Sequence, residues 1–264
     1  MSSDVRILVL GDVIGRPGIR AVVTGLSALR RTYKADFVIV NGENADEGFG
    51  LSPEISEQIF SAGADIITSG NHIWQHEDVA DVLNGSKPVL RPANYPKGCP
   101  GQGVAVLNVR GVSIAVVNLQ GRRRMPAIDC PFRKMRELKK KELVGANLLV
   151  VDFHAEATEE KEALAFMLDG SATLVYGTHT HVQTADERIL SGGTAYITDV
   201  GATGPRDSVI GFEPEISIER SITLVPHKNC VLDHAAVLNG VFVVADAETG
   251  LAKSIERVAQ ASAV

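Results

Sequence analysis

Five apolar, β-branched segments that each lead into a small polar cluster constrain the fold of this chain more than any other feature. The segments are RILVL, DFVIV, DIITS, NLLVV and the shorter ATLVY. The clusters that follow them are Gly11-Asp12, Gly42-Glu43-Asn44, Gly70-Asn71-His72, Asp152-Phe153-His154 and Gly177-Thr178-His179-Thr180-His181. Segments of this kind are typical of buried strands. Because ligands of an open α/β sheet bind at the carboxyl ends of its strands, we expect the five clusters to lie near one another.

Helical patterns between these segments predict consecutive βα units. After RILVL, Pro17-Gly18 precede a periodic apolar pattern that ends near Lys34. After DFVIV, Ser52 is placed to cap a helix and Pro53 to occupy its first turn. The remaining predicted helices cover residues 132–143 and 158–168.

The middle and the end of the chain add strands of another kind. GVAVLNV and VSIAVVNL flank Arg110-Gly111 and predict an antiparallel hairpin. TAYITDV, ITLVP and GVFVVADAE are predicted to close the chain as short strands. The predicted fold class is therefore α/β, or α+β in some schemes, with two packed mixed sheets flanked by helices in a single domain over residues 1–264.

Composition excludes several classes of protein. With 264 residues, of which 45% are hydrophobic and 22% charged, the chain has enough apolar residues for a sizeable core. The formal net charge of −6 argues against binding to duplex nucleic acid. Cys99, Cys130 and Cys230 lack the spacing of a zinc ribbon or a disulfide framework, which favours a reducing compartment. No membrane-spanning or targeting segment is recognisable, so we expect a cytoplasmic protein.

The polar residues of the clusters have ordinary explanations when each is taken alone. Asp12 is suited to cap a helix, and Glu43-Asn44 to lie in a solvated turn. His179 and His181 are harder to explain, because alternate residues of an extended segment place both imidazoles on one face. Oxygen and nitrogen ligands then gather at the strand ends from Asp12, Glu43, Asn71, His154, His179 and His181. Taken jointly, the clusters predict a metal site.

The order of the clusters resembles that of the calcineurin-like metallophosphoesterases, whose sequence blocks run DxH, GDxxD, GNH, a lone His and GHxH. Two positions depart from this pattern. Ile14 stands where the family usually carries a histidine, and Glu43-Asn44 replaces the usual aspartate. The YmdB-type branch shares both departures. The similarity to this branch extends through RPANYP, LQGRRRMPAIDCPF and TDVGATGPRDSVIG, and therefore covers nearly the whole chain.

The resemblance implies a four-layer sandwich that holds two divalent or trivalent metal ions. One ion would be held by Asp12, Glu43, Asn44 and His181, and the other by Glu43, Asn71, His154 and His179. Glu43 would bridge the ions, and the amide oxygen of Asn44 would replace the imidazole missing at position 14. His72 would act as general acid toward the leaving oxygen while a hydroxide shared by the ions attacks phosphorus in line. Iron or manganese is favoured, and zinc also suits such ligands.

The implied activity is that of a phosphodiesterase that hydrolyses small cyclic nucleotides, with 2′,3′-cyclic nucleotides favoured. The implied assembly is a homo-oligomer without a membrane or duplex nucleic acid as partner. A phosphomonoesterase or phosphoprotein phosphatase is an alternative, since the same ions serve monoesters and diesters. A metal-dependent, nucleotide-binding regulator with little turnover is another.

Two further features of the sequence receive less weight. The three arginines at positions 122–124 are expected to lie in a solvated loop, with contact to a substrate phosphate as the less favoured alternative. The glycines after the first predicted strand form neither GxGxxG nor GxxxxGK[ST]. The sequence therefore supports neither a dinucleotide-binding fold nor a phosphate loop.

Overall fold

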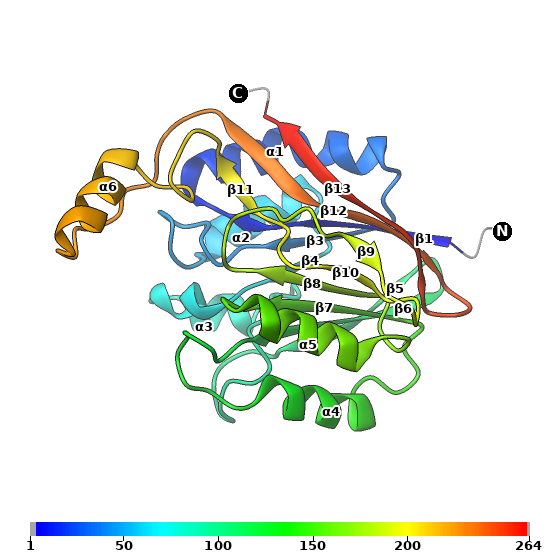
Figure 1. The fold of residues 1–264 in the computed structure, drawn as a ribbon. Coiled ribbons are helices and arrows are strands. Elements are labelled where there is room, and N and C mark those ends of the chain that lie inside the picture. Colours follow the sequence, from blue (N-terminus) through cyan, green and yellow to red (C-terminus); the bar gives the residue numbers. More distant parts are fainter. Residues whose placement is uncertain (1–3, 263–264) are drawn as a thin grey trace.

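Two β-sheets pack face to face between layers of helices in the computed structural model, which describes residues 4–262 (Figure 1). The remaining residues of the predicted domain, 1–3 and 263–264, lie outside the described part. The first sheet has seven strands in the order β2-β11-β12-β1-β3-β4, with β13 paired to β12. Its strands are β1 (Asp4–Leu10), β2 (Asp12–Val13), β3 (Phe37–Asn41), β4 (Ile66–Thr68), β11 (Ala202–Pro205), β12 (Ala236–Asp246) and β13 (Ala252–Ala261).

The second sheet has six strands in the order β5-β6-β7-β8-β10-β9. Its strands are β5 (Val104–Val109), β6 (Val112–Gln120), β7 (Leu148–His154), β8 (Leu174–Thr178), β9 (Arg188–Ile189) and β10 (Ala195–Ile197). Strands β6, β7, β8 and β10 are parallel, whereas the edge strands β5 and β9 are antiparallel to their neighbours. Both sheets are therefore mixed, as predicted, because β1 also pairs parallel to β3 and antiparallel to β12.

The helices of the described residues are α1 (Gly15–Thr32), α2 (Pro53–Ala62), α3 (Val79–Leu83), α4 (Pro131–Lys141), α5 (Thr158–Leu168), α6 (Pro214–Thr223) and the 3₁₀ helix η1 (Asn71–Gln75). Of these, α1 and α2 pack on the outer face of the first sheet, and α4 and α5 on that of the second. Figure 1 places α1 on the outer side of the first sheet and α4 and α5 on the outer side of the second, while α6 projects from one end. Within residues 4–262, no helix is both long enough and apolar enough to span a membrane.

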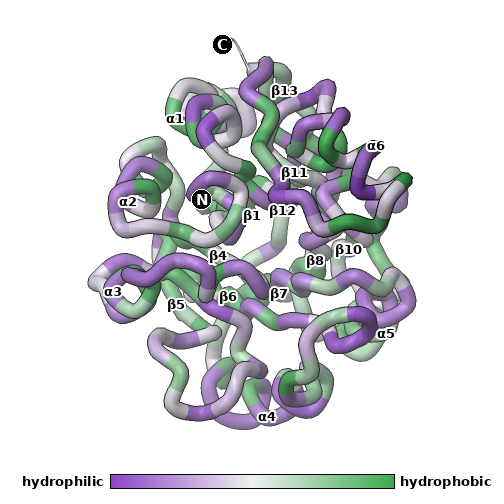
Figure 2. Tube along the Cα trace, turned by 90° about the vertical axis from the view of Figure 1, so that its left-hand side faces the viewer, coloured by the Kyte–Doolittle hydropathy of each residue, from purple (hydrophilic) through white to green (hydrophobic). Residues whose placement is uncertain are grey.

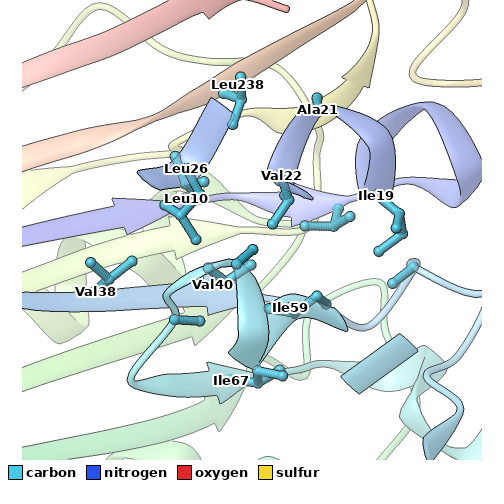
Figure 3. Packing of buried hydrophobic residues seen from close by; sticks show 14 of the residues in the cluster. Leu10, Ile19, Ala21, Val22, Leu26, Val38, Val40, Ile59, Ile67 and Leu238 are labelled. Carbon is cyan, nitrogen blue, oxygen red and sulfur yellow. The ribbon is translucent and has the colours of Figure 1, made fainter. Parts of the chain in front are cut away.

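Three apolar cores hold these layers together. Figure 3 shows the first, in which Leu10 and Val40 of the first sheet pack against Val22 of α1 and Ile59 of α2. The second core lies between the sheets, and the third joins the second sheet to α4 and α5. In Figure 2 the apolar segments accordingly gather along the central strands, and the helices alternate between apolar and polar residues. This arrangement confirms the predicted fold class.

The layer between the sheets changes from apolar to polar along the strands. In β7, Leu148 and Val150 belong to the core between the sheets, whereas Leu149 and Val151 belong to the core beneath α4 and α5. Side chains alternate along a strand, so Asp152 and His154 also point between the sheets. The same holds for Asn41 of β3, Thr68 of β4 and Thr178 of β8 at their carboxyl ends. The fold therefore places a buried polar layer between the sheets, directly beneath the loops that follow these strands.

Several predicted elements are confirmed. The hairpin around Arg110-Gly111 is formed by β5 and β6, and the predicted helix over residues 158–168 coincides with α5. Helix α2 begins at Pro53 with Ser52 at the N-cap position, although the Ser52 side chain makes no capping hydrogen bond. The first helix begins earlier than predicted, since Pro17 and Gly18 lie inside the first turn of α1. The N–H groups of a first turn have no acceptor within the helix, so the missing N–H of Pro17 costs no hydrogen bond there.

Of the strands predicted near the end of the chain, one is wrong and one is shorter than expected. ITLVP does not form a strand: Thr223 ends helix α6, and Leu224 follows it in the left-handed conformation. Ile218 and Ile222 are four residues apart, which is a helical spacing, and both are exposed. TAYITDV is a strand only over β10, because the chain leaves the sheet after Ile197. The short strands β2, β9 and β11 and the mostly exposed strand β13 were not predicted, since none carries an apolar run.

Candidate metal centre

The predicted site residues come together at the carboxyl ends of strands from both sheets. Asp12 lies in β2, Glu43 and Asn44 follow β3, Asn71 and His72 begin η1, His154 ends β7, and His179 and His181 follow β8. The contacts among these side chains form two groups that share Glu43, and His72 lies at their edge.

The first group surrounds the Nε2 atom of His154. This nitrogen lies 3.1 Å from Glu43 Oε1, 3.1 Å from Asn71 Oδ1 and 3.1 Å from His179 Nδ1. Each of these atoms can offer a lone pair, so they repel one another unless a proton or a cation lies among them. Ligand atoms of Glu43, His154 and His179 all lie within 4.8 Å of one another, which suits a single metal ion. The donor set therefore fits a metal.

The second group surrounds Asp12. Its Oδ2 atom is 3.8 Å from His181 Nε2, and that nitrogen is 3.1 Å from Asn44 Nδ2. Asn44 Nδ2 is in turn 3.2 Å from Glu43 Oε1, which links the second group to the first. Asp12 is fully buried, and its Oδ1 atom has no hydrogen-bond partner among residues 4–262. A buried carboxylate oxygen without a partner is costly, and a bound cation would provide the missing interaction.

The orientation of the Asn44 amide bears on its role as a ligand. Its nitrogen faces Glu43 and His181, and its oxygen lies 2.7 Å from His72 Nδ1. In this orientation the amide oxygen does not face Asp12. A half-turn of the amide exchanges the two atoms, directs the oxygen toward the second group and directs an N–H toward His72. Metal ligation by Asn44 therefore requires that half-turn.

Burial and neighbouring charges set the protonation of the cluster. Burial raises the pKa of Asp12 well above its usual range. Burial also acts to raise the pKa of Glu43, but the neighbouring His154 and His72 lower it to about 2. At His154 burial acts to lower the pKa, but Glu43 and Asp12 raise it to about 9. Burial and the adjacent His154 lower the pKa of His179 to about 3. In the metal-free protein, the positive charge of the cluster therefore resides on His154.

His72 lies at the edge of this cluster, where a bound molecule can reach it. Its backbone N–H donates to Glu43 Oε2 at 3.0 Å, and the ring of Phe49 packs edge-on at a centroid distance of 5.0 Å. The His72 side chain is 28% exposed, whereas Glu43 is fully buried. Burial lowers the pKa of His72, so its protonated form gives up a proton more readily.

The backbone at Gly70 passes so close to the cluster that it requires glycine. A Cβ atom at this position would collide with the His154 ring and with Glu43 Oε2. Gly70 therefore allows η1 to begin directly against the two side chains, which brings Asn71 within reach of His154.

The prediction that His179 and His181 lie on one face of an extended segment is wrong, although the two residues do lie beside the cluster. Strand β8 ends at Thr178, and the two histidines have φ angles of 100° and 65° in a loop rather than in an extended segment. Asp199 holds this loop from below, because its Oδ2 atom accepts hydrogen bonds from the Thr180 N–H at 3.1 Å and the Thr180 hydroxyl at 2.8 Å. These contacts support a backbone conformation that is otherwise unfavourable for non-glycine residues.

Sequence reasoning missed the buried polar residues that support the cluster. Asp152 and Thr178 lie beneath His154, and Lys161 of α5 forms a buried ion pair with Asp199 at 2.8 Å. A signal was present for Asp152, because it falls on the same face of β7 as the apolar Leu148. A carboxylate at a core position indicates a specific hydrogen-bonding role. The three arginines at positions 122–124 are exposed, as predicted, and the backbone N–H groups of the first two bind Glu160.

Solved structures of other proteins share this architecture. A 5′-nucleotidase precursor from Thermus thermophilus superposes with a TM-score of 0.57 over 98% of this chain and 54% of its own, at 16% identity. A structure described as a novel phosphatase from Mycoplasma pneumoniae superposes with a TM-score of 0.94 at 38% identity, over 99% of this chain and 95% of its own. The two helix-flanked mixed sheets and the cluster at the strand ends define a calcineurin-like metallophosphoesterase, which is a phosphoric ester hydrolase.

Within this class, the relationship to one family covers almost the whole chain. A model of the YmdB-like protein family matches residues 8–258. A 2′,3′-cyclic-nucleotide 2′-phosphodiesterase of Bacillus subtilis is 46% identical over 253 residues, which cover 96% of each chain. This chain belongs to the YmdB-like family.

Proposed function

We propose that this chain is a metal-dependent phosphodiesterase that hydrolyses small cyclic nucleotides, with 2′,3′-cyclic nucleotides as the favoured substrates. The observation that carries the proposal is the convergence of three ligand-type atoms within 3.1 Å of His154 Nε2, next to the buried carboxylate of Asp12. The preference for cyclic nucleotides is supported by the name of the Bacillus subtilis relative.

The two groups of side chains support a centre for two metal ions. We assign Asp12, Glu43, Asn44 and His181 to one ion and Glu43, Asn71, His154 and His179 to the other. Glu43 suits the bridging position because its Oε1 atom contacts both groups. The mixture of carboxylate, amide and imidazole ligands favours iron or manganese and is also compatible with zinc.

The side chains of the centre would bind and orient the phosphoester. Two bound cations would polarise the phosphoryl oxygens and lower the pKa of a water molecule from about 15.7 toward about 7. His72 is partly exposed, lies 2.7 Å from the amide of the proposed ligand Asn44, and is itself assigned to neither ion. From this position the protonated His72 ring would donate its proton to the leaving oxygen as the ester bond breaks.

The experiment that tests this function compares two substrates and two metal states. The chain is purified without chelator, and its metal content is measured together with hydrolysis of 2′,3′-cyclic AMP and of p-nitrophenyl phosphate. Both assays are repeated after chelation and again after Mn²⁺ is restored. We expect about two metals per chain and diesterase activity that is lost and regained with the metal. A protein without bound metal, or with activity that survives chelation, would contradict the proposal.

The same assay separates the proposed function from its alternatives. The description of the Mycoplasma pneumoniae structure as a phosphatase favours phosphomonoesterase activity as a second candidate. A large preference for the monoester would establish that candidate instead of the diesterase. Bound metal with neither activity would indicate a nucleotide-binding regulator.

Replacement of His72 by alanine tests its role as general acid. His72→Ala is expected to keep its metal, because no ion is assigned to this side chain, and to lose about 10²- to 10⁴-fold in turnover. Metal content and kcat are measured on the same preparation. Undiminished phosphodiesterase activity in this variant would refute the assignment.

The surroundings of the enzyme are also proposed rather than observed. The free thiols of Cys99, Cys130 and Cys230 support a location in the reducing cytoplasm. The resemblance to the YmdB-type branch supports a homo-oligomer, and size-exclusion chromatography with light scattering would test it.

A further inference from the structure

A buried hydroxyl connects the proposed ligand His154 to a carboxylate beneath it. Thr178 Oγ1 lies 2.9 Å from His154 Nδ1 and 2.8 Å from Asp152 Oδ1. All three residues are fully buried, so no solvent competes for these hydrogen bonds. The connection is therefore a fixed part of the layer between the sheets. It meets His154 at Nδ1, whereas Glu43, Asn71 and His179 lie at Nε2.

The hydrogen bonds of Asp152 determine which groups donate and which accept along this connection. Its Oδ2 atom accepts from the Thr68 hydroxyl at 2.5 Å and from the Asn41 amide at 3.2 Å, and its Oδ1 atom accepts from Thr178. Asn41 and Thr68 belong to the first sheet, whereas Thr178 belongs to the second. Three donors converge on one carboxylate, which makes Asp152 an acceptor only.

The same reasoning assigns the donor and the acceptor between Thr178 and His154. A threonine hydroxyl has a single hydrogen, and Thr178 gives it to Asp152. Its oxygen is left to accept, so the N–H group in the contact with His154 must be that of Nδ1. Nε2 is the ring nitrogen that faces Glu43, Asn71 and His179.

We propose that Asp152 and Thr178 are positioning residues that hold the His154 ring with its N–H at Nδ1 and its ligating lone pair at Nε2, directed at the metal. The inference rests on the metal centre of the proposed function and assigns roles to two residues outside its ligand set. We call the hydrogen bonds from His154 through Thr178 to Asp152 the relay. The donors of the first sheet, Asn41 and Thr68, give this relay a second effect. They fix Asp152, and through it the orientation of His154, relative to Glu43, which follows β3 of the facing sheet.

The test is the affinity of the chelated full-length chain for Mn²⁺, measured by titration calorimetry. Thr178→Val has nearly the same shape but no hydroxyl, so it leaves the His154 Nδ1–H without an acceptor. We expect it to weaken binding about 10- to 100-fold, the usual effect of removing a partner that orients a metal ligand. Thr178→Ser keeps the hydroxyl and is expected to restore most of that affinity.

A matched control separates this effect from the loss of any buried hydroxyl. Thr173 precedes the same strand, is equally buried, donates to the Gly250 carbonyl at 2.6 Å and accepts from the Leu149 N–H at 3.1 Å. Thr173→Val therefore removes the same pattern of hydrogen bonds at a site without proposed ligands. It is expected to lower the melting temperature and to leave Mn²⁺ affinity unchanged.

The outcomes distinguish the relay from the metal centre. Wild-type affinity in Thr178→Val, or equal losses in the valine and serine variants, would overturn the relay while leaving the metal centre intact. A wild-type chain that binds no Mn²⁺ would overturn both. As a second readout, ¹⁵N spectra of histidine-labelled, Zn²⁺-loaded protein should show His154 coordinated through Nε2 and protonated at Nδ1. Coordination through Nδ1 would contradict the proposal directly.

Discussion

At the scale of single residues, Glu43 is the member of the cluster that belongs to both of its groups. Its Oε1 atom lies close to Asn44 and His154, and its Oε2 atom accepts the backbone N–H of His72. Asp12, by contrast, lies 3.8 Å from His181, and its Oδ1 atom has no hydrogen-bond partner among residues 4–262 and lies 3.9 Å from His154 Nδ1. Because Glu43 belongs to both groups and Asp12 to one, the two carboxylates are expected to differ when each is neutralised.

Neutralising each carboxylate gives the first prediction. Glu43→Gln should lower the occupancy of both metal sites, whereas Asp12→Asn should chiefly lower one. Loss of a partner that merely orients a ligand costs about 10- to 100-fold in metal affinity, so loss of a ligand charge should cost at least that much. Metal content per chain, measured by elemental analysis, checks the prediction. Equal and unaltered metal content in the two variants would overturn the ligand assignment.

The sequence predicted which residues gather at the site but not how they are oriented. Donors placed directly after buried strands must meet at one sheet edge, so residues such as His154 follow from the strand pattern alone. The left-handed loop that carries His179 depends on Asp199, which is distant in sequence. The orientation of the Asn44 amide likewise depends on His72, which lies in another element. Contacts between elements determine these orientations, so the local periodicity of the sequence cannot predict them.

At the scale of the elements, helices α1 and α6 show how differently an apolar side chain can contribute to stability. Leu26 of α1 is fully buried in the core that Figure 3 shows, where α1 packs on the first sheet. Helix α6 has no buried residue, and its Ile222 is 73% exposed. The sequence pattern located α1 but placed a strand over ITLVP, where α6 ends. Which of the two helices supports the core follows from its packing in the structure.

Alanine substitutions in the two helices give the second prediction. Leu26→Ala should lower the free energy of unfolding by about 2–5 kcal/mol, because it removes a buried side chain and leaves a cavity. Ile222→Ala should change that free energy by no more than about 0.5 kcal/mol, as is usual for an exposed position. Urea denaturation followed by circular dichroism measures both. A loss of several kcal/mol in Ile222→Ala would show that α6 is covered in the native protein.

At the scale of the whole molecule, the two sheets share both an apolar core and a polar layer. Ile7 and Ile39 of the first sheet pack in one core with Val116 and Val150 of the second. Above this core, Asp152 of the second sheet accepts hydrogen bonds from Asn41 and Thr68 of the first. Separating the sheets would expose the core and leave a buried carboxylate without its donors. We therefore propose that the chain folds as one domain, as its sequence predicts.

Unfolding that is cooperative across both sheets is the third prediction. Trp74 is the only tryptophan of the chain and lies in η1 beside the cluster, so its fluorescence reports on the site, whereas circular dichroism reports on both sheets. In urea the two signals should change with one midpoint. Mn²⁺ at a free concentration about 100 times its Kd should stabilise the chain by about 2.7 kcal/mol for each site filled, and should move both signals together. If the fluorescence transition alone moved, metal binding would stabilise only the region around η1. The region around η1 would then unfold separately from the two sheets, and unfolding would not be cooperative across the chain.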